Sequence, residues 1–228
     1  MRGVITAAAR SPRLLPITKH IPASLLEVGD KAIIAHQLEA LQKAGVKSTL
    51  VITGYCADQV DEFCSGKASC VFNPFYDVCN VAMNLWLVRQ ELKSGFILIY
   101  NDILFQAKLI EELLAIEEHI VLVVDKKGLD KEAEKVDLRQ GVVSAIGKDI
   151  ADPYGEFIGI AMFSRDVISV LIEELEKVAR TDLSTTFPQL VELLVQHYQN
   201  VKVLATDRPW IDIDFPHELE EARRMWGY

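Results

Sequence analysis

The chain has 228 residues, of which 50% are hydrophobic and 25% are charged, and its formal net charge is -9. This composition excludes disordered and fibrous proteins and predicts a single soluble folded domain. The negative balance disfavours a nucleic-acid-binding surface, because neutralising phosphates requires clustered lysine and arginine. No apolar segment approaches the roughly 20 residues that span a bilayer, and the N-terminal apolar stretch is too short for a signal peptide, so we expect a cytoplasmic protein.

The cysteines indicate a reducing environment and no zinc site. None of them forms a CxxC pair or shows a Cys/His spacing typical of zinc ligands. We therefore expect buried free thiols at all four positions, which are Cys56, Cys64, Cys70 and Cys79.

The first half of the chain alternates short apolar runs with longer amphipathic stretches, which is typical of βαβ units around a mainly parallel sheet. The predicted strands cover residues 3–8, 48–53, 70–73, 95–102 and 120–125. The predicted helices cover residues 31–45, 57–64, 81–92 and 108–116. The apolar run of residues 95–102 ends abruptly on Asn101 and Asp102.

The second half changes character between residues 126 and 164, where shorter runs punctuated by turns predict antiparallel strands added to the sheet. Two helices, a strand, the segment "PWIDIDFP" and a last helix follow, predicted at 165–179, 187–198, 201–206, 209–216 and 217–225. The fold class is therefore α/β: a Rossmann-like, mainly parallel sheet flanked by helices, with an antiparallel extension. We predict one domain, 1–228, with halves 1–125 and 126–228.

Three polar clusters follow predicted strands, at the edge where open parallel sheets bind ligands. They are Arg10 with Arg13, Asn101 with Asp102, and Asp212 with Asp214. Two carboxylates and two guanidiniums in one crevice would suit a magnesium-bound polyphosphate. Taken singly, an aspartate after a strand is more often a helix cap or a turn residue.

Eight stretches carry a family resemblance in order along nearly the full length. They read "ITAAARSPRLLPIT", "HIPASLLEVGDKAIIAHQLEALQKAGV", "VITGYCADQV", "NPFYDVCNVAMNLWLVRQEL", "LIYNDILF", "EAEKV", "YGEFIGIAMFS" and "PWIDIDFPHELEEAR". The chain resembles the nucleoside-triphosphate transferase family of sugar-phosphate nucleotidyltransferases, in particular its phosphocholine cytidylyltransferase-like branch. The first stretch stands where that family writes the glycine-rich loop L-A-A-G-x-G-x-R-L-x-P-x-T.

The resemblance implies a reaction between a nucleoside triphosphate and a small phosphorylated acceptor. A phosphate oxygen of the acceptor attacks the α-phosphate in line, and pyrophosphate leaves, which demands positioning and neutralisation of crowded anions. The likeness of "NPFYDVCNVAMNLW" to the phosphocholine-type branch makes CTP the expected donor. A phospho-alcohol, a phosphonate or a sugar phosphate would fit as acceptor.

The resemblance also assigns residues and a magnesium cofactor. The catalytic residues would be Arg13, Lys19, Asp102 and Asp214, and the two aspartates would bind Mg²⁺. The nucleotide-binding residues would be Ala8, Ala9, Arg10, Ser11, Arg13, Gly54, Asn80 and Asp102. The acceptor-binding residues would be Asn80, Lys135, Lys148, Glu156 and Asp212. For the two lysines, a solvated position on an edge strand is an equal alternative.

The sequence departs from the family pattern at the loop. Ala9 and Ser11 replace its two glycines and Pro12 follows, so the backbone must take another path or hold the nucleotide less tightly, since positive φ is costly for alanine and serine and closed to proline. Ala23 stands where the family has a lysine that neutralises the reacting phosphates, and Lys19 or Arg10 would have to substitute.

Two classes of function remain open. The chain is an active nucleotidyltransferase with a rebuilt loop, or a catalytically impaired binding or regulatory protein on the same fold. Retention of Asp102 and Asp214 favours the enzyme, whereas loss of the glycines and the lysine favours the second hypothesis. A Rossmann-type dehydrogenase is disfavoured because the sequence has no G-x-G-x-x-G after its first strand. A homodimer is compatible with either function.

Overall fold

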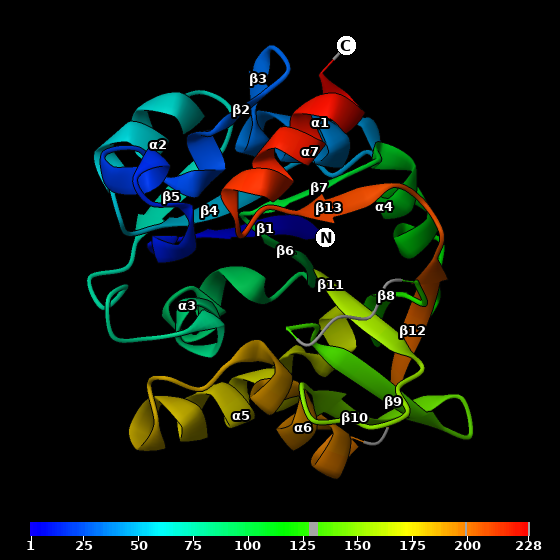
Figure 1. Cartoon of the computed structure of the whole chain (residues 1–228). Helices are drawn as coiled ribbons and strands as arrows, with labels where there is room; N and C mark the ends of the chain where they lie inside the picture. Colours follow the sequence, from blue (N-terminus) through cyan, green and yellow to red (C-terminus); the bar gives the residue numbers. More distant parts are fainter. Residues whose placement is uncertain (128–131, 199, 228) are drawn as a thin grey trace. The chain divides into compact units, whose positions relative to one another are not determined.

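The computed structural model describes residues 1–127, 132–198 and 200–227. The chain forms two compact units (Figure 1). Unit 1 contains Met1 and residues 78–98 and 113–207, and unit 2 contains residues 2–77, 99–112 and 208–228. Each unit is thus assembled from segments far apart in the sequence. The single domain with halves meeting at residue 125 stays a prediction.

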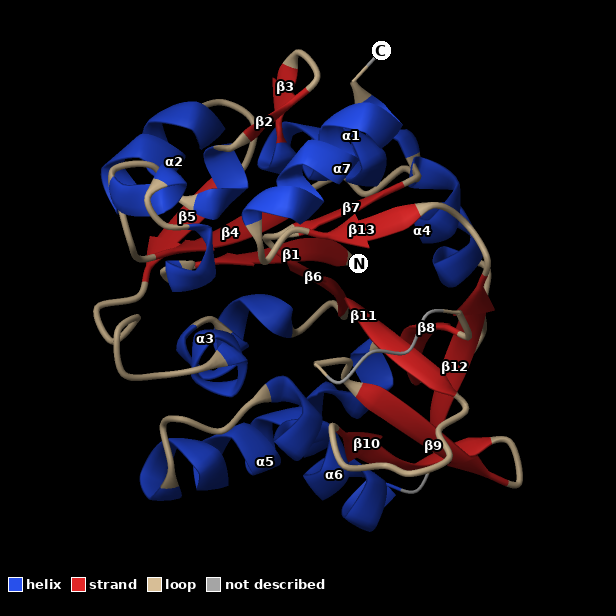
Figure 2. Cartoon of the chain, viewed as in Figure 1, coloured by secondary structure: helices blue, strands red, loops and turns tan. Residues whose placement is uncertain are grey.

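Unit 2 is built on a parallel sheet. The strands are β1 (Arg2–Ala7), β4 (Thr49–Thr53) and β5 (Ser69–Phe72), in the order β1-β4-β5. The residues of β4 are all buried, because helices cover the sheet. Helix α1 (Ile33–Lys43) ends before Gly45, whose φ of 84° suits glycine, and α2 (Ala57–Cys64) packs against β4 and β5 (Figure 2).

Shorter elements complete unit 2. These are the 3-10 helices η1 (Pro12–Leu14), η2 (Ile17–Lys19) and η3 (Ala23–Leu25), the pair β2 (Glu27–Val28) and β3 (Lys31–Ala32), the pair β7 (Ile103–Phe105) and β13 (Trp210–Asp212), and helix α7 (Pro216–Trp226). Leu14, Ile33, Leu104, Ile213 and Leu219 meet in one apolar core, so the first loop, β7, β13 and α7 are packed together. Figure 1 shows α1 and α7 beside these two short strands.

Unit 1 carries the antiparallel strands. They are β8 (Ile120–Asp125), β9 (Lys135–Arg139), β10 (Val142–Gly147) and β11 (Gly155–Phe163), and β12 (Val201–Thr206) runs parallel to β8. Its helices are α3 (Val81–Leu87), η4 (Arg89–Leu92), η5 (Arg165–Val167), α5 (Ile168–Thr181) and α6 (Phe187–Tyr198). Gln140 and Gly141 join β9 to β10, and both have positive φ, as a two-residue hairpin turn requires. The chain passes from one unit to the other within strand β6 (Phe96–Tyr100) and within helix α4 (Ala107–Leu114).

The predicted α/β class and its antiparallel extension are confirmed, although four of the residues at 126–164, namely 128–131, lie outside the described part. The structure differs from the prediction in three places. The predicted helix at 81–92 continues beyond Leu87 only as the 3-10 turn η4. Strand β6 stops at Tyr100 and leaves Asn101 and Asp102 in a turn. The pairs formed by β2, β3, β7 and β13 were not predicted, because two or three residues show no periodicity.

The cysteine prediction is partly wrong. None of the four cysteines, all of which lie in the described part of the chain, forms a disulfide, but only Cys64 is buried, whereas Cys56, Cys70 and Cys79 are partly exposed. Cys56 precedes α2 in the left-handed region, with φ 51°. In the described part of the chain, no helix has the length and apolar character needed to cross a membrane.

Candidate active site

Three aspartates of unit 2 meet at the end of β13. Asp102 lies in the turn between β6 and β7, and its carbonyl accepts a hydrogen bond from the Ile213 N–H at 3.0 Å. Asp212 ends β13, and Asp214 lies two residues further on, so both project to the same side of an extended segment. One carboxylate oxygen from each of the three lies within 4.8 Å of the others. We call Asp102, Asp212 and Asp214 the aspartate cluster.

Burial and the like charges of the aspartate cluster disfavour the ionised forms of its carboxyl groups. Burial, reinforced by the charge of Asp214, raises the pKa of Asp102 to about 7. Burial also raises the pKa of Asp212 well above its usual range, with the charges of Asp102 and Asp214 adding to the effect. The Oδ1 atoms of Asp102 and Asp212 are buried and have no hydrogen-bond partner among the described residues. Such orphaned carboxylate oxygens fit a hard divalent cation, which takes oxygen ligands.

The raised pKa values predict a pH dependence of cation binding. A divalent cation binds the ionised carboxylates, so its affinity should be low below pH 7 and should rise as the pH rises through about 7. Cation binding should also release protons. Titration calorimetry with Mn²⁺ at pH 6, 7 and 8, in two buffers of different ionisation enthalpy, measures both effects. An affinity independent of pH over this range would contradict the prediction.

The first loop brings Arg13 to the aspartate cluster. Its Nη1–H donates to Asp214 Oδ2 at 2.6 Å, and the guanidinium carbon lies 5.4 Å from the Phe215 ring centroid. Leu14, the next residue, is fully buried in the core and anchors the turn η1. The Arg13 side chain remains 43% exposed, so the guanidinium is accessible to a ligand.

Arg10 is held elsewhere. Its guanidinium donates to both carboxylate oxygens of Asp77, at 2.7 and 3.4 Å, and lies 4.7 Å from the ring centroid of Tyr55 and 5.9 Å from that of Tyr76. The predicted convergence of two arginines on the carboxylates therefore applies to Arg13, while Arg10 is paired with an acid that was not among the predicted site residues.

The loop without glycines avoids the left-handed backbone region. Among the described residues, none at 8–19 has a positive φ. The backbone forms the successive turns η1 and η2, and the Thr18 hydroxyl donates to the Ser11 carbonyl at 2.8 Å. Gly54 packs directly beneath the loop start: a Cβ there would lie 2.5 Å from both the Ala8 carbonyl oxygen and Tyr76 Cβ. The close approach of Ala8 to the residue after β4 therefore requires glycine at position 54.

The two residues related to the missing family lysine have different environments. Lys19 ends η2, and its exposed side chain has no partner among the described residues, whereas its backbone carbonyl accepts a hydrogen bond from the Tyr55 hydroxyl at 2.6 Å. Ala23 is 2% exposed and belongs to the apolar core with Leu14 and Leu26. Lys19 can therefore offer its charge to a ligand, but position 23 is built for a small apolar side chain.

Ala23→Lys should lower the melting temperature and should not restore turnover. A lysine at this site must bury its stem in the core or displace η3, and overpacking typically costs about 1–3 kcal/mol. Thermal unfolding and steady-state kinetics of this variant, with Ala57→Lys at the partly exposed start of α2 as control, measure both effects. Increased turnover with unchanged melting would show that only charge is missing.

Gln37 braces the turn that carries Asp102. This residue of α1 is 1% exposed, and its Nε2 donates to the carbonyls of Tyr100 and Ile103, at 2.7 and 2.8 Å. These two residues flank Asn101 and Asp102, so one side chain fixes both ends of the turn. Gln37 was not among the predicted site residues, although a glutamine on the apolar face of a predicted helix was a readable signal.

Gln37→Leu should destabilise the fold by ~2–3 kcal/mol, because two buried carbonyls lose their partner. It should also weaken Mn²⁺ binding to the aspartate cluster, which a purely global loss of stability would not do below the unfolding transition. Gln59→Leu is the matched control, since Gln59 also donates to a backbone carbonyl, that of His20, at an exposed site. Chemical unfolding and Mn²⁺ titration at 15 °C compare the two, and equal Mn²⁺ affinities would refute the positioning role.

The predicted acceptor residues are split between the units. Glu156 of β11 faces Lys135 of β9 in the strand register, and the Lys135 ammonium donates to the Lys148 carbonyl at 2.8 Å. Lys148 itself pairs with Glu132 at 2.9 Å. Asn80 is the N-cap of α3 and accepts the Val81 N–H. These four residues belong to unit 1, whereas Asp212 belongs to unit 2 and lies in the aspartate cluster.

Comparisons with known proteins agree with this architecture. The family model of nucleotidyl transferases matches residues 2–113. A CTP:phosphoglutamine cytidylyltransferase of Campylobacter jejuni is 27% identical, over 96% of this chain and 98% of that protein. A choline-phosphate cytidylyltransferase of Streptococcus pneumoniae is 32% identical over 46% of this chain and 47% of its own length.

Solved structures show the same fold. The CTP:phosphocholine cytidylyltransferase of S. pneumoniae has a TM-score of 0.82 at 20% identity, covering 98% of each chain. The inositol-1-phosphate CTP transferase of T. maritima has a TM-score of 0.83 at 21% identity, covering 99% of this chain and 95% of that one. The chain has the fold of the nucleotide-diphospho-sugar transferases. It is a nucleotidyltransferase.

The nucleotidyl transferase family model thus matches about the first half of the chain, and named cytidylyltransferases match it over about half to nearly all of its length. The resemblance drawn from the sequence is thereby confirmed.

Proposed function

We propose that this protein transfers a cytidylyl group from CTP to a small phosphorylated acceptor and releases pyrophosphate. The observation that carries the proposal is the aspartate cluster with Arg13 on its rim, at the end of the first loop of a nucleotidyltransferase fold. CTP is supported by two relatives of this chain that are named as cytidylyltransferases, one of them with CTP in its name. A phospho-alcohol, a phosphorylated amino-acid derivative, a phosphonate or a sugar phosphate would suit the acceptor role.

The reaction needs no general base. An ionised phosphate oxygen of the acceptor attacks the α-phosphorus, the new P–O bond forms, and the bond to the β-phosphate oxygen breaks with its electron pair leaving on pyrophosphate. The chain's task is therefore to hold and neutralise anions. Arg13 would pair with the β- and γ-phosphates through its planar fork, and Lys19 would add a second positive charge beside the same loop.

Asp102 and Asp214, together with Asp212, would hold Mg²⁺. Magnesium, when bound, supplies charge neutralisation to the triphosphate and polarises the α-phosphate. Arg13, which pairs with Asp214 in this structure, would then bind the phosphates, and Asp214 would be one of the residues that hold the cation. Ala8, Ala9, Ser11 and Gly54 would approach the nucleotide with their backbone.

Four further residues would contact the acceptor. Lys135 and Glu156 are cross-strand neighbours, so a cation and an anion lie side by side, an arrangement that would suit a zwitterionic phosphorylated acceptor. Lys148 would contribute its charge on release from Glu132. Asn80 would present its amide nitrogen to the acceptor or the base while its carbonyl oxygen caps α3.

A pyrophosphate-release assay tests the proposal. Four nucleoside triphosphates are each combined with a panel of phosphocholine, phosphoglutamine, inositol 1-phosphate, an aminoalkyl phosphonate and a sugar 1-phosphate, with Mg²⁺. Release is expected with CTP and at least one acceptor, and it should require both substrates. Release that needs no acceptor, or that persists in Asp102→Ala, would refute nucleotidyl transfer at this site.

A catalytically impaired regulatory protein is the second candidate, favoured by the loop that lacks positive-φ residues and by the apolar setting of Ala23. It predicts that CTP with Mg²⁺ raises the melting temperature while no acceptor of the panel supports pyrophosphate release. The assay and a thermal-shift titration together separate the two functions.

A further inference from the structure

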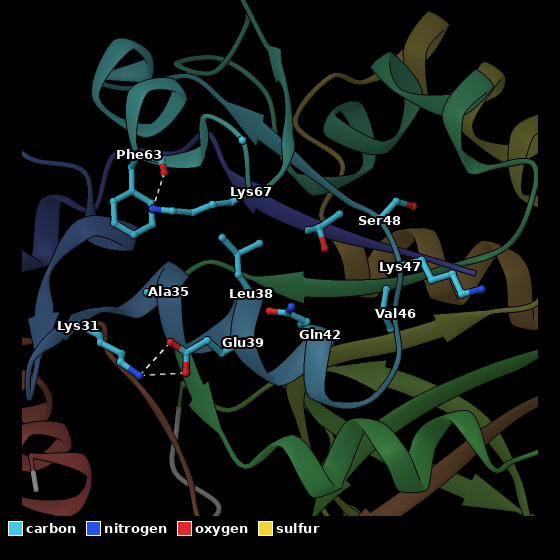
Figure 3. Close-up of a pocket in the computed structure, with 12 residues that line it drawn as sticks. Lys31, Ala35, Leu38, Glu39, Gln42, Val46, Lys47, Ser48, Phe63 and Lys67 are labelled. Carbon is cyan, nitrogen blue, oxygen red and sulfur yellow. Dashed lines mark hydrogen bonds and ion pairs between the residues drawn. The ribbon is translucent and has the colours of Figure 1, made fainter.

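A cavity lies in unit 2, away from the aspartate cluster. It has a volume of about 490 Å³ and lies between α1, residues 46–49 and the end of α2 with the turn after it (Figure 3). Thr49, which lines it, begins β4, whereas Thr53 ends that strand beside the first loop. The rise from Thr49 to Thr53 is about 13 Å at ~3.3 Å per residue, so the cavity opens at the opposite edge of the sheet.

The cavity is positively charged in a strongly acidic chain. Lys31, Lys47 and Lys67 line it with a single acid, Glu39, giving a local formal charge of +2 in a chain of -9. Lys31 is neutralised by Glu39 at 2.8 Å. The Lys67 ammonium donates to the Phe63 carbonyl at 2.9 Å, and within the described ranges neither Lys47 nor Lys67 pairs with a carboxylate. Two ammonium groups are therefore available to an anion.

The rest of the lining is apolar. Leu38 and Val46 lie between the two lysines in Figure 3, and the Phe63 ring, with the Lys67 ammonium 3.8 Å from its centroid, forms one end. A volume of 490 Å³ falls in the range of organic ligands and greatly exceeds a bare phosphate ion. The ligand must therefore combine an anionic group with a carbon body.

We infer that this cavity is a second ligand site, which binds a small organic anion through Lys47 and Lys67 and packs the ligand's apolar body against Leu38, Val46 and Phe63. The anionic group is a phosphate or a carboxylate. This site is independent of the proposed transferase reaction, because it shares no residue with the aspartate cluster or the first loop.

Amide NMR spectra of the full chain test the site with defined probes. Phenyl phosphate and benzoate represent the two anions, and benzyl alcohol and benzylamine are the neutral and cationic counterparts. We expect phenyl phosphate, benzoate or both to shift the Ser48 and Gly66 amides saturably, with no comparable effect of the two counterparts. The stronger of the two anions identifies the anionic group.

The double variant Lys47→Glu/Lys67→Glu should weaken this binding about tenfold or more, since two favourable charges become repulsive. Lys93→Glu/Lys202→Glu has the same charge change outside the cavity and should bind as the wild type does. Leu38→Asn provides a second test, because it alters the apolar wall and leaves the charge unchanged. Shifts confined to residues 8–19, equal binding of benzyl alcohol, or unchanged affinity in the Lys47/Lys67 variant would overturn the inference.

Discussion

Asp102→Asn should reduce nucleotidyl transfer by ~10³-fold or more and, at the same time, stabilise the metal-free protein at pH 8. Asparagine keeps the shape of the side chain but removes one charge from the aspartate cluster. The cation then loses a buried ligand, and the remaining carboxylates lose a repulsive neighbour.

The sign and pH window of the stability effect follow from the pKa of Asp102. Its folded-state value of about 7 exceeds the ordinary value of 3.8, so the folded state binds an extra proton between these limits. The free energy of unfolding of the wild type should therefore decrease as the pH rises from 4 to 7, by ~2–4 kcal/mol in total. The reason is that one extra bound proton in the folded state changes the stability by ~1.4 kcal/mol per pH unit. Asp102→Asn should lack this contribution and match the protonated wild type at pH 4, so its stability should fall less over the interval, with the remaining fall coming from Asp212, whose pKa is also raised by burial.

Urea unfolding of both proteins in EDTA at pH 4.5, 6 and 8 measures this difference. Asp152→Asn, at an exposed position of unit 1, is the control and should change neither activity nor stability. Saturating Mg²⁺ should stabilise the wild type at pH 8 and leave Asp102→Asn unaffected. A destabilised Asp102→Asn at pH 8 would mean that the carboxylate is structural, with a partner that offsets its burial.

Arg13→Ala should lower kcat/KM for CTP by about 10²–10³-fold, because the triphosphate loses the guanidinium nearest to the aspartate cluster. The stability effect should be small, since both partners of the Arg13–Asp214 ion pair are more than a third exposed. Arg13→Lys should recover only part of the activity, because an ammonium cannot form two parallel hydrogen bonds to oxyanions.

Arg10→Ala is the matched comparison for Arg13→Ala. It removes the same charge from the same loop, but Arg10 is engaged with Asp77, Tyr55 and Tyr76. We expect a loss at least tenfold smaller than for Arg13→Ala. Equal losses for both variants would assign Arg10 to the phosphates as well, and an unchanged kcat/KM in Arg13→Ala would remove Arg13 from the proposed mechanism.

Residues close in sequence determined most of the secondary structure and part of the candidate site. The buried strands β1, β4 and β8 and the helix α2 were predicted within a residue or two, because their apolar patterns have a clear period. Asp212 and Asp214 share a face because alternate residues of an extended segment do so, and that relation is readable from "IDID". The likeness of whole stretches to a known family indicated which aspartates and which arginine to compare.

The tertiary structure decided where charges separated by a hundred residues meet. The pairing of β7 with β13 brings Asp102 to Asp212, and three-residue strands leave no periodic signal in the sequence. Whether Arg10 or Arg13 reaches a given carboxylate depends on how the first loop turns, and that is set by the burial of Leu14. The raised pKa of Asp102 likewise belongs to the folded protein alone, because burial and the charge of Asp214 exist only when both segments are packed in one core.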